Sequence, residues 1–173
     1  IVPFAGYSMP VQFEGIMGEH NWTRQSAGLF DVSHMGQRFL AGPDHETTAA
    51  ALETLTPGTF AKLKHGAMRY TVLLNDDGGI IDDLIVTRSI SPDDAGRLMV
   101  VVNGARKRVD DAHIEARLPD GVELQKIEDR ALMALQGPEA AEALGAFCEK
   151  AKALTFMTAT SAEFTLADGS VVD

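Results

Sequence analysis

The sequence contains one cysteine and no long apolar run. Cys148 has no partner within the chain, so an intramolecular disulfide framework is excluded and a reducing compartment is permitted. The longest apolar stretches, such as 98–102, are far shorter than the roughly 20 residues that span a bilayer. Lys and Arg number 15 against 25 Asp and Glu, which gives a net charge of −10 and no basic stripe for a phosphate backbone. We therefore expect neither a membrane span nor nucleic-acid binding.

Signatures of several enzyme classes are also missing. The absence of GxGxxG, GxxxxGK[ST] and GxSxG removes the usual sequence support for a dinucleotide site, a P-loop or an α/β-hydrolase elbow. The five histidines show no HxH or HExxH spacing, so we expect no transition-metal site. The acidic run 76–83 lacks the alternating oxygen ligands and closing Glu of a calcium loop. We therefore expect no metal bound through Asp76, Asp77, Asp82 or Asp83.

The composition is that of an ordinary globular protein, with 45% hydrophobic and 23% charged residues. A length of 173 residues suits one sizeable domain or two small ones. The chain opens on Ile1 without an initiator Met and ends at Asp173, where a strand is expected to begin. We therefore expect a fragment of a longer protein.

The pattern of apolar residues and turn residues predicts alternating strands and helices. The strongest local signal is the run Asn-Asp-Asp-Gly-Gly at 75–79 between two apolar segments, which predicts an antiparallel hairpin over 68–87 with its turn at 76–79. Helices are expected at 14–27, 43–55, 105–118 and from Pro138, and further strands at 29–32, 37–41, 98–102, 122–126 and 131–135, with a last hairpin around 167–169. Hairpin-joined strands interleaved with helices indicate an α+β fold with mostly antiparallel sheets.

Two adjacent carboxylates, Asp82 and Asp83, lie inside an otherwise apolar strand. Because successive side chains on a strand point to opposite faces, the two carboxylates face opposite sides, and both faces are expected to be buried. A carboxylate on a buried face must be hydrogen-bonded, paired or held with a raised pKa, as catalytic acids often are. The alternative is that one Asp pairs with Arg69 or Arg88 while the other caps a loop or faces solvent. The pattern alone does not say which Asp matters.

Five segments, taken in order, resemble one family. They are VPFAGYSMPVQ at 2–12, AGLFDVSHMG at 27–36, GGIIDDL at 78–84, VVVN at 100–103 and LMALQGP at 132–138. Together they resemble the aminomethyltransferases, or T-proteins, of the glycine cleavage system, and the resemblance covers essentially the whole chain.

The resemblance implies a folate-binding fold and a transferase activity. T-proteins take the aminomethyl group from the lipoyl arm of H-protein, release ammonia and pass the one-carbon unit to tetrahydrofolate, in the bacterial cytoplasm or the mitochondrial matrix. Carried over by position, Asp83 is the catalytic residue beside N10 of the folate. Met35, Tyr70, Val101 and Asn103 contact the pterin side. The amide of Asn103, just past a strand end, offers both a donor and an acceptor to a pterin edge.

The resemblance also implies two folate-binding subdomains, one formed by 1–31 plus 121–173 and one by 32–120. The family's Gly-Tyr-Thr-Gly-Glu segment, a later Arg and the carboxy-terminal barrel are not in this sequence, so we expect the chain alone to be inactive. Two alternatives stay open: a non-catalytic folate-binding protein of the same fold, and the folate domain of a sarcosine or dimethylglycine dehydrogenase.

Overall fold

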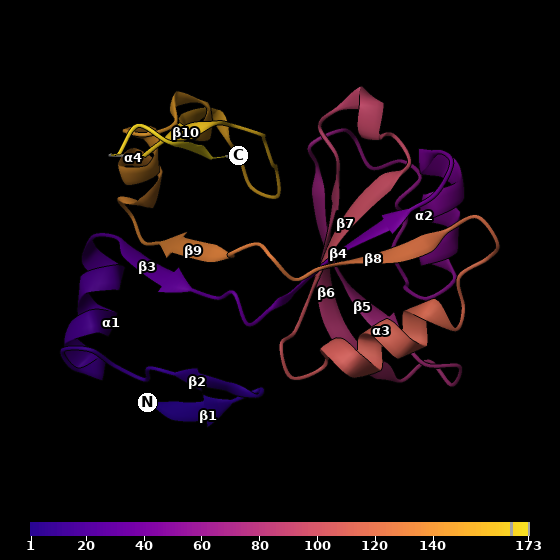
Figure 1. Cartoon of the computed structure of the whole chain (residues 1–173), viewed down its shortest axis with the longest axis horizontal. Helices are drawn as coiled ribbons and strands as arrows, with labels where there is room; N and C mark the ends of the chain where they lie inside the picture. Colours follow the sequence, from indigo (N-terminus) through magenta and orange to yellow (C-terminus); the bar gives the residue numbers. More distant parts are fainter. Residues whose placement is uncertain (167, 173) are drawn as a thin grey trace. The chain divides into compact units, whose positions relative to one another are not determined.

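The chain forms two compact units (Figure 1). The computed structural model describes residues 1–166 and 168–172. Unit 1 consists of Ile1–His34, Ala131–Phe156 and Thr160–Asp173, and unit 2 of Met35–Arg130 and Met157–Ala159. Unit 2 is therefore inserted between two parts of unit 1 in the sequence.

Unit 2 is built on a five-stranded sheet in which every neighbouring pair is antiparallel. In order across the sheet the strands are β5 (Met68–Leu74), β6 (Ile80–Arg88), β7 (Arg97–Val102), β4 (Gly36–Ala41) and β8 (Glu123–Ile127). The unit also holds helices α2 (His45–Glu53) and α3 (Lys107–Glu115) and the short 3-10 helix η1 (Pro92–Asp94).

The β5–β6 hairpin confirms the predicted hairpin over 68–87. Val72 lies opposite Asp83, and a bulge between Leu73 and Leu74 follows before the turn. The turn is held by the side chain of Asn75, which accepts from the backbone N of Gly79 at 2.7 Å, and Gly78 supplies the positive φ of 79° that the reversal needs.

The hydrophobic core of unit 2 lies on one face of this sheet. Leu84 and Val86 of β6 are buried there together with Leu52 of α2 and Ile114 of α3. Asp82 shares this face, whereas Asp83 points to the opposite one, where the residues of β5, β6 and β7 are half-buried or exposed and Gln37 of β4 is buried. The expectation that both faces of β6 are buried was therefore wrong for unit 2 taken by itself, because its helices pack on the Asp82 face alone.

Unit 1 is made of short elements. Its helices are α1 (Ile16–Gln25), α4 (Ala140–Gly145) and the 3-10 helix η2 (Glu149–Ala153), and its antiparallel pairs are β1 (Val2–Phe4) with β2 (Tyr7–Met9), β3 (Gly28–Asp31) with β9 (Met133–Gln136), and β10 (Phe164–Thr165) with β11 (Val171–Val172). None of the α1 residues is buried. No helix among the described residues is long and apolar enough to cross a bilayer.

The predicted α+β class with mostly antiparallel sheets is confirmed, and two details differ. The β1–β2 hairpin was not predicted, because its turn places Ala5 and Gly6 at positive φ, a conformation that Ala seldom adopts. The boundaries of the units differ from those expected for the subdomains: 121–130 belong to unit 2, because β8 pairs with β4, and 32–34 belong to unit 1. The predicted hairpin around 167–169 forms between β10 and β11, and its residue 167 lies outside the described residues.

Candidate functional site

Asp83 is a half-buried carboxylate on the uncovered face of the unit 2 sheet. Its Oδ2 accepts a short hydrogen bond from the phenol of Tyr70, and its Oδ1 accepts from Nδ2 of Asn103 at 2.9 Å. The two donors come from β5 and from the residue that follows β7. Asp83 is thus held from both neighbouring strands.

Tyr70 reaches Asp83 diagonally across the hairpin. Tyr70 lies opposite Ile85, and Val72 lies opposite Asp83, so the two polar side chains are two positions apart on one face. The hydrogen bond to Asp83 is the main cause that raises the pKa of Tyr70, helped by partial desolvation and by the charges of Asp83 and Asp82. Tyr70 therefore stays a protonated donor at neutral pH, although its side chain is 59% exposed.

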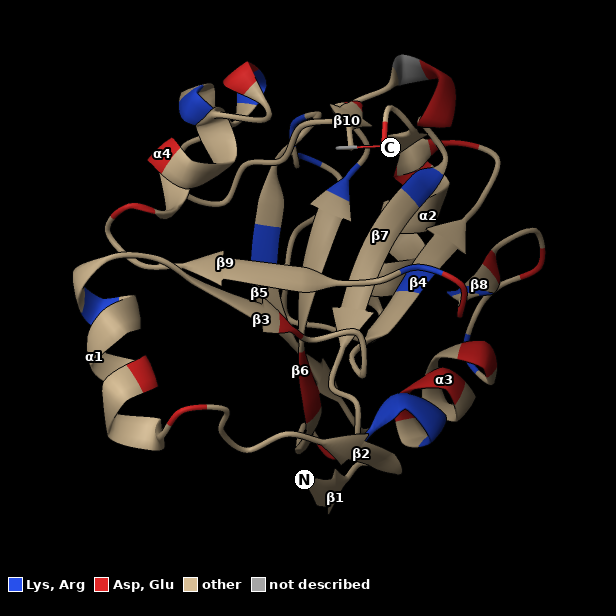
Figure 2. Cartoon of the chain, turned by 60° about the vertical axis from the view of Figure 1, so that its left-hand side comes forward, with Lys and Arg blue, Asp and Glu red and all other residues tan. Residues whose placement is uncertain are grey.

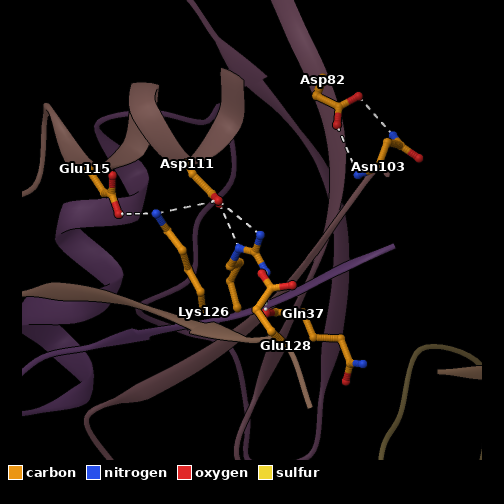
Figure 3. A network of polar contacts seen from close by, with 8 residues as sticks. Gln37, Asp82, Asn103, Asp111, Glu115, Lys126 and Glu128 are labelled. Atoms are coloured by element: carbon orange, nitrogen blue, oxygen red, sulfur yellow. Dashed lines mark hydrogen bonds and ion pairs between the residues drawn. The ribbon is translucent and has the colours of Figure 1, made fainter. Parts of the chain in front are cut away.

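Asn103 connects the two aspartates. Its Nδ2 donates to Oδ1 of Asp82 at 2.9 Å as well as to Asp83, and its backbone N donates to Oδ2 of Asp82 at 3.2 Å. In Figure 3 the amide nitrogen of Asn103 points toward Asp82 and its amide oxygen points away. One side-chain amide therefore fixes carboxylates that project from opposite faces of β6.

Asp82 is a structural partner of Asn103. It is 8% exposed and lies on the core face. Asp82 and Asp83 are the acidic residues of β6, whose acidic segment is red in Figure 2. The alternative pairing with Arg69 or Arg88 does not occur, since these two donate to the backbone oxygens of Thr59 and Leu63 instead.

Strand register places three of the predicted site residues on one face. Ile85 lies opposite both Tyr70 and Val101, so these residues form one row across β5, β6 and β7. Asp83 lies two positions from Ile85 on β6, opposite Val72 of β5. Met35 directly precedes β4 and Asn103 directly follows β7, outside the paired residues. Among the predicted residues only Tyr70, Asp83 and Asn103 are joined by hydrogen bonds.

Behind the sheet, Asp110 of α3 is completely buried. Its pKa is raised to about 7, first by burial and then by the neighbouring carboxylate of Asp82, with a smaller increase from Asp111 and an opposing effect of Arg106. Sequence reasoning did not find Asp110. The available signal was its spacing of four from Ile114, which puts an acid on the buried stripe of an amphipathic helix.

Arg38 fastens α3 to the sheet. Its guanidinium, 2% exposed, binds both oxygens of Asp111, through Nε at 2.7 Å and Nη2 at 3.0 Å, and its Nη1 contacts Glu128 at 3.1 Å. Lys126 of β8 adds a 2.7 Å ion pair with Glu115 (Figure 3). Strands β4 and β8 are thereby connected to the helix that carries Asp110.

The family described as the GCVT N-terminal domain matches residues 1–172. The chain belongs to this family. Its relatives named aminomethyltransferase include a probable mitochondrial protein of Schizosaccharomyces pombe, 44% identical over 82% of this chain and 36% of that protein. Others are a protein of Flavobacterium psychrophilum, 42% identical over 83% and 38%, and a mitochondrial protein of Saccharomyces cerevisiae, 40% identical over 99% and 44%.

The fold agrees with a solved structure of the same family. The glycine cleavage system aminomethyltransferase T from Bartonella henselae superposes with a TM-score of 0.80 at 38% identity, over 91% of this chain and 42% of that one. This GCVT chain thus spans about two fifths of the length of the relatives it matches.

In this GCVT family member the site around Asp83 combines polar and apolar side chains. Among residues 1–166 and 168–172, no three His, Cys, Asp or Glu side chains converge in a way that could hold a metal ion. The polar groups at Asp83 are a carboxylate, a phenol and a carboxamide, and they are flanked by the apolar side chains of Val101 and Ile85. Such a combination suits a flat organic ligand that carries N–H donors.

Proposed function

We infer that this chain is the substrate-binding amino-terminal part of an aminomethyltransferase that transfers a one-carbon unit to tetrahydrofolate. The donor is the aminomethyl group on the lipoyl arm of H-protein, and ammonia is released. The observation that carries the inference is the geometry of Asp83, a carboxylate held by Tyr70 and Asn103 on the uncovered face of the sheet.

Asp83 can orient and deprotonate an amine. Tyr70 and Asn103 each occupy one of its oxygens, and a carboxylate has about four lone-pair sites, so acceptor capacity is left for a ligand N–H. A fixed base that positions a reacting nitrogen and takes up its proton contributes by proximity and by general base catalysis. The family resemblance assigns the same residue to N10 of the folate.

The neighbouring residues fit the pterin side of tetrahydrofolate. Val101 and Ile85 lie in one row on the face that Asp83 shares, and Met35 and Asn103 adjoin the paired ends of β4 and β7, at Gly36 and Val102. When bound, the folate supplies the amine nitrogens that accept the one-carbon unit. Asn103 and Tyr70 hold Asp83 in place, and the apolar residues flank the ring.

Partners and compartment follow from the same proposal. A glycine cleavage aminomethyltransferase requires lipoylated H-protein as the carrier of its substrate. Relatives of this chain are named from bacteria and, with a mitochondrial designation, from yeasts. We therefore place the protein in the bacterial cytoplasm or the mitochondrial matrix.

The decisive experiment compares Asp83→Asn with the wild type in the complete protein. Loss of a positioned base should lower transfer from aminomethylated H-protein to tetrahydrofolate by roughly 10²–10⁴-fold. Tetrahydrofolate binding, measured separately by calorimetry, should fall far less because Asn has the same size and keeps part of the hydrogen bonding.

Asp77→Asn is the matched control, since Asp77 is exposed in the turn of the same hairpin. This variant should transfer at the wild-type rate. Normal turnover by Asp83→Asn would refute the role of Asp83. A wild-type protein that binds tetrahydrofolate but transfers nothing would point instead to a non-catalytic folate-binding protein.

A further inference from the structure

The carboxyl group of Asp110 is buried without a hydrogen-bond donor. Its residue is 0% exposed, and neither side-chain oxygen has a hydrogen-bond partner among the described residues. An ionised carboxylate in this position loses its hydration and gains no hydrogen bond in return, which is costly. The arrangement therefore requires a proton.

The charged groups around Asp110 come from three places. Asp82 of β6 is buried on the sheet face against which Ile114 of α3 packs, and its negative charge raises the pKa of Asp110. Arg106, just before α3, contributes a favourable charge but no hydrogen bond or ion pair to Asp110. Asp111 follows on α3, and both of its oxygens are already bound by Arg38. Asp82 is thus the group that can complete the hydrogen bonding of Asp110.

Two neighbouring buried carboxylates cannot both ionise without strong repulsion, and one shared proton removes the conflict. Asp82 accepts two hydrogen bonds from Asn103, which stabilise its ionised form. Asp110 accepts none and is more deeply buried. The proton consequently belongs on Asp110, with its O–H donated to Asp82.

We propose that Asp110 and Asp82 share one proton across a buried carboxyl–carboxylate hydrogen bond, and that Asp110 is thereby a positioning residue for the site at Asp83. The connection runs through Asn103, whose Nδ2 binds Asp82 and Asp83 at 2.9 Å each. With the proton in place, Asp82, Asp83 and Asp110 together carry two negative charges. Without the proton they carry three, and repulsion displaces Asp82 together with the amide of Asn103 that orients Asp83.

The proton sharing is independent of the proposed reaction, whereas the positioning role rests on the proposed function. The raised pKa of Asp110, about 7, supports a proton that is held below neutral pH and lost above it. Asp110 therefore connects the geometry of Asp83 to pH, although it lies on the opposite side of the sheet.

Infrared spectroscopy of the complete protein tests the shared proton. The wild type should show the carbonyl stretch of a protonated carboxyl group at about pH 6 and lose it as the pH rises through about 7. The band should be absent from Asp110→Asn, whose amide keeps a donor toward Asp82. It should be unchanged in the control Asp120→Asn, an exposed carboxylate just beyond α3. Absence of the band from the wild type, or its persistence in Asp110→Asn, would overturn the proposal. The titration of the wild type decides the matter even if the variant fails to fold.

The pH profile of transfer tests the positioning role. The ratio of the Asp110→Asn rate to the wild-type rate should rise by about 10- to 100-fold from about pH 6 to about pH 9, because only the wild type loses its alignment. A ratio that is independent of pH would overturn the positioning role. Normal turnover by Asp83→Asn would refute the proposed function but leave the infrared result standing.

Discussion

Asp82 and Asp83 are adjacent in the chain yet have different roles, because the pleat of β6 places their side chains on opposite faces. Asp83 is half-exposed and retains acceptor capacity for a ligand, while Asp82 is buried and holds Asn103. A single amide, Nδ2 of Asn103, joins them. Hydrogen bonds to Asn103, which directly follows β7, therefore fix the positions of both carboxylates.

The two aspartates should respond differently to amide substitution. We expect Asp82→Asn to lower aminomethyl transfer by less than the roughly 10²–10⁴-fold loss expected for Asp83→Asn, because Asp82 acts only through Asn103. Transfer rates and tetrahydrofolate binding of both variants, measured side by side, check this. If Asp82→Asn were the more damaged enzyme, the assignment of Asp83 as the base would be wrong.

Asp110 should make the protein less stable as the pH rises. Its pKa is about 7 in the folded state, against the ordinary aspartate value of 3.8 that applies to the unfolded chain. Between these values the folded state binds more protons than the unfolded state, so this group's contribution to the free energy of unfolding falls with pH. The fall is at most about 1.4 kcal/mol per pH unit.

Urea unfolding of the wild type and Asp110→Asn at several pH values measures this effect. The stability of Asp110→Asn relative to the wild type should increase from about pH 4 to about pH 7 and then level off. A difference that stays constant over this window would show that Asp110 does not carry the extra proton.

At the scale of elements, α3 is held to the sheet by the buried side chain of Ile114 and by a buried ion pair. Arg38 binds Asp111 through two nitrogens, and Lys126 binds Glu115 one turn further along the helix. Since Asp110 precedes Asp111, the same attachment sets the distance between Asp110 and β6. The fastening of the helix and the geometry of the site are therefore coupled.

Arg38→Met should be strongly destabilising. Removing the cation leaves the buried Asp111 with only the more distant Lys126, whose Nζ lies 3.8 Å from Oδ2, and losing a buried partner costs about 3–5 kcal/mol. The control is Arg117→Met, which removes a 3.1 Å ion pair with the exposed Asp76 and should cost about 1 kcal/mol or less. Equal losses in denaturant unfolding would contradict the special role of the Arg38–Asp111 pair.

Local patterns predicted most elements of unit 2, because periodicity and turn residues are local properties. The β5–β6 hairpin is an example, since its two strands and its Asn-Asp-Asp-Gly-Gly turn are contiguous. The neighbours of Asp110 were not predictable in this way. The packing of α3 against β6 joins segments that no local pattern relates, and the placement of β8 beside β4 likewise depends on long-range pairing.

The site was predictable only in part for the same reason. Alternation on β6 separated Asp82 from Asp83, but the choice of Asp83, and of Met35, Tyr70, Val101 and Asn103 around it, came from the family resemblance. The bridging amide of Asn103 became visible only once β7 was placed beside β6.

At the scale of the whole molecule, the two units differ in how much apolar surface they bury. Unit 2 has a continuous core of fully buried side chains. Unit 1 leaves large apolar side chains exposed, among them Trp22 at 64% and Phe13 at 84%. With so little buried surface, unit 1 should have a much lower free energy of local opening than unit 2.

Hydrogen exchange of this chain should show that difference directly. Amides of β4, β6 and β7 should be the slowest to exchange, and amides of α1 should exchange orders of magnitude faster because helix α1 has no buried residue. Protection of α1 equal to that of β6 would contradict this order.

The insertion of unit 2 within unit 1 has a consequence for synthesis on the ribosome. β3 and β9 pair although Gly28 and Gln136 are about 100 residues apart, and closing so long a flexible loop carries an entropic cost. The chain enters unit 2 at Met35 and leaves it at Arg130, next to β4 and β8, which are paired neighbours. Once unit 2 has folded, the two ends that lead to β3 and β9 are already close together. We therefore expect unit 2 to fold first in the nascent chain. Folded unit 2 then holds the end of the segment 1–34 close to the start of the segment that begins at Ala131, so that β3 and β9 can pair.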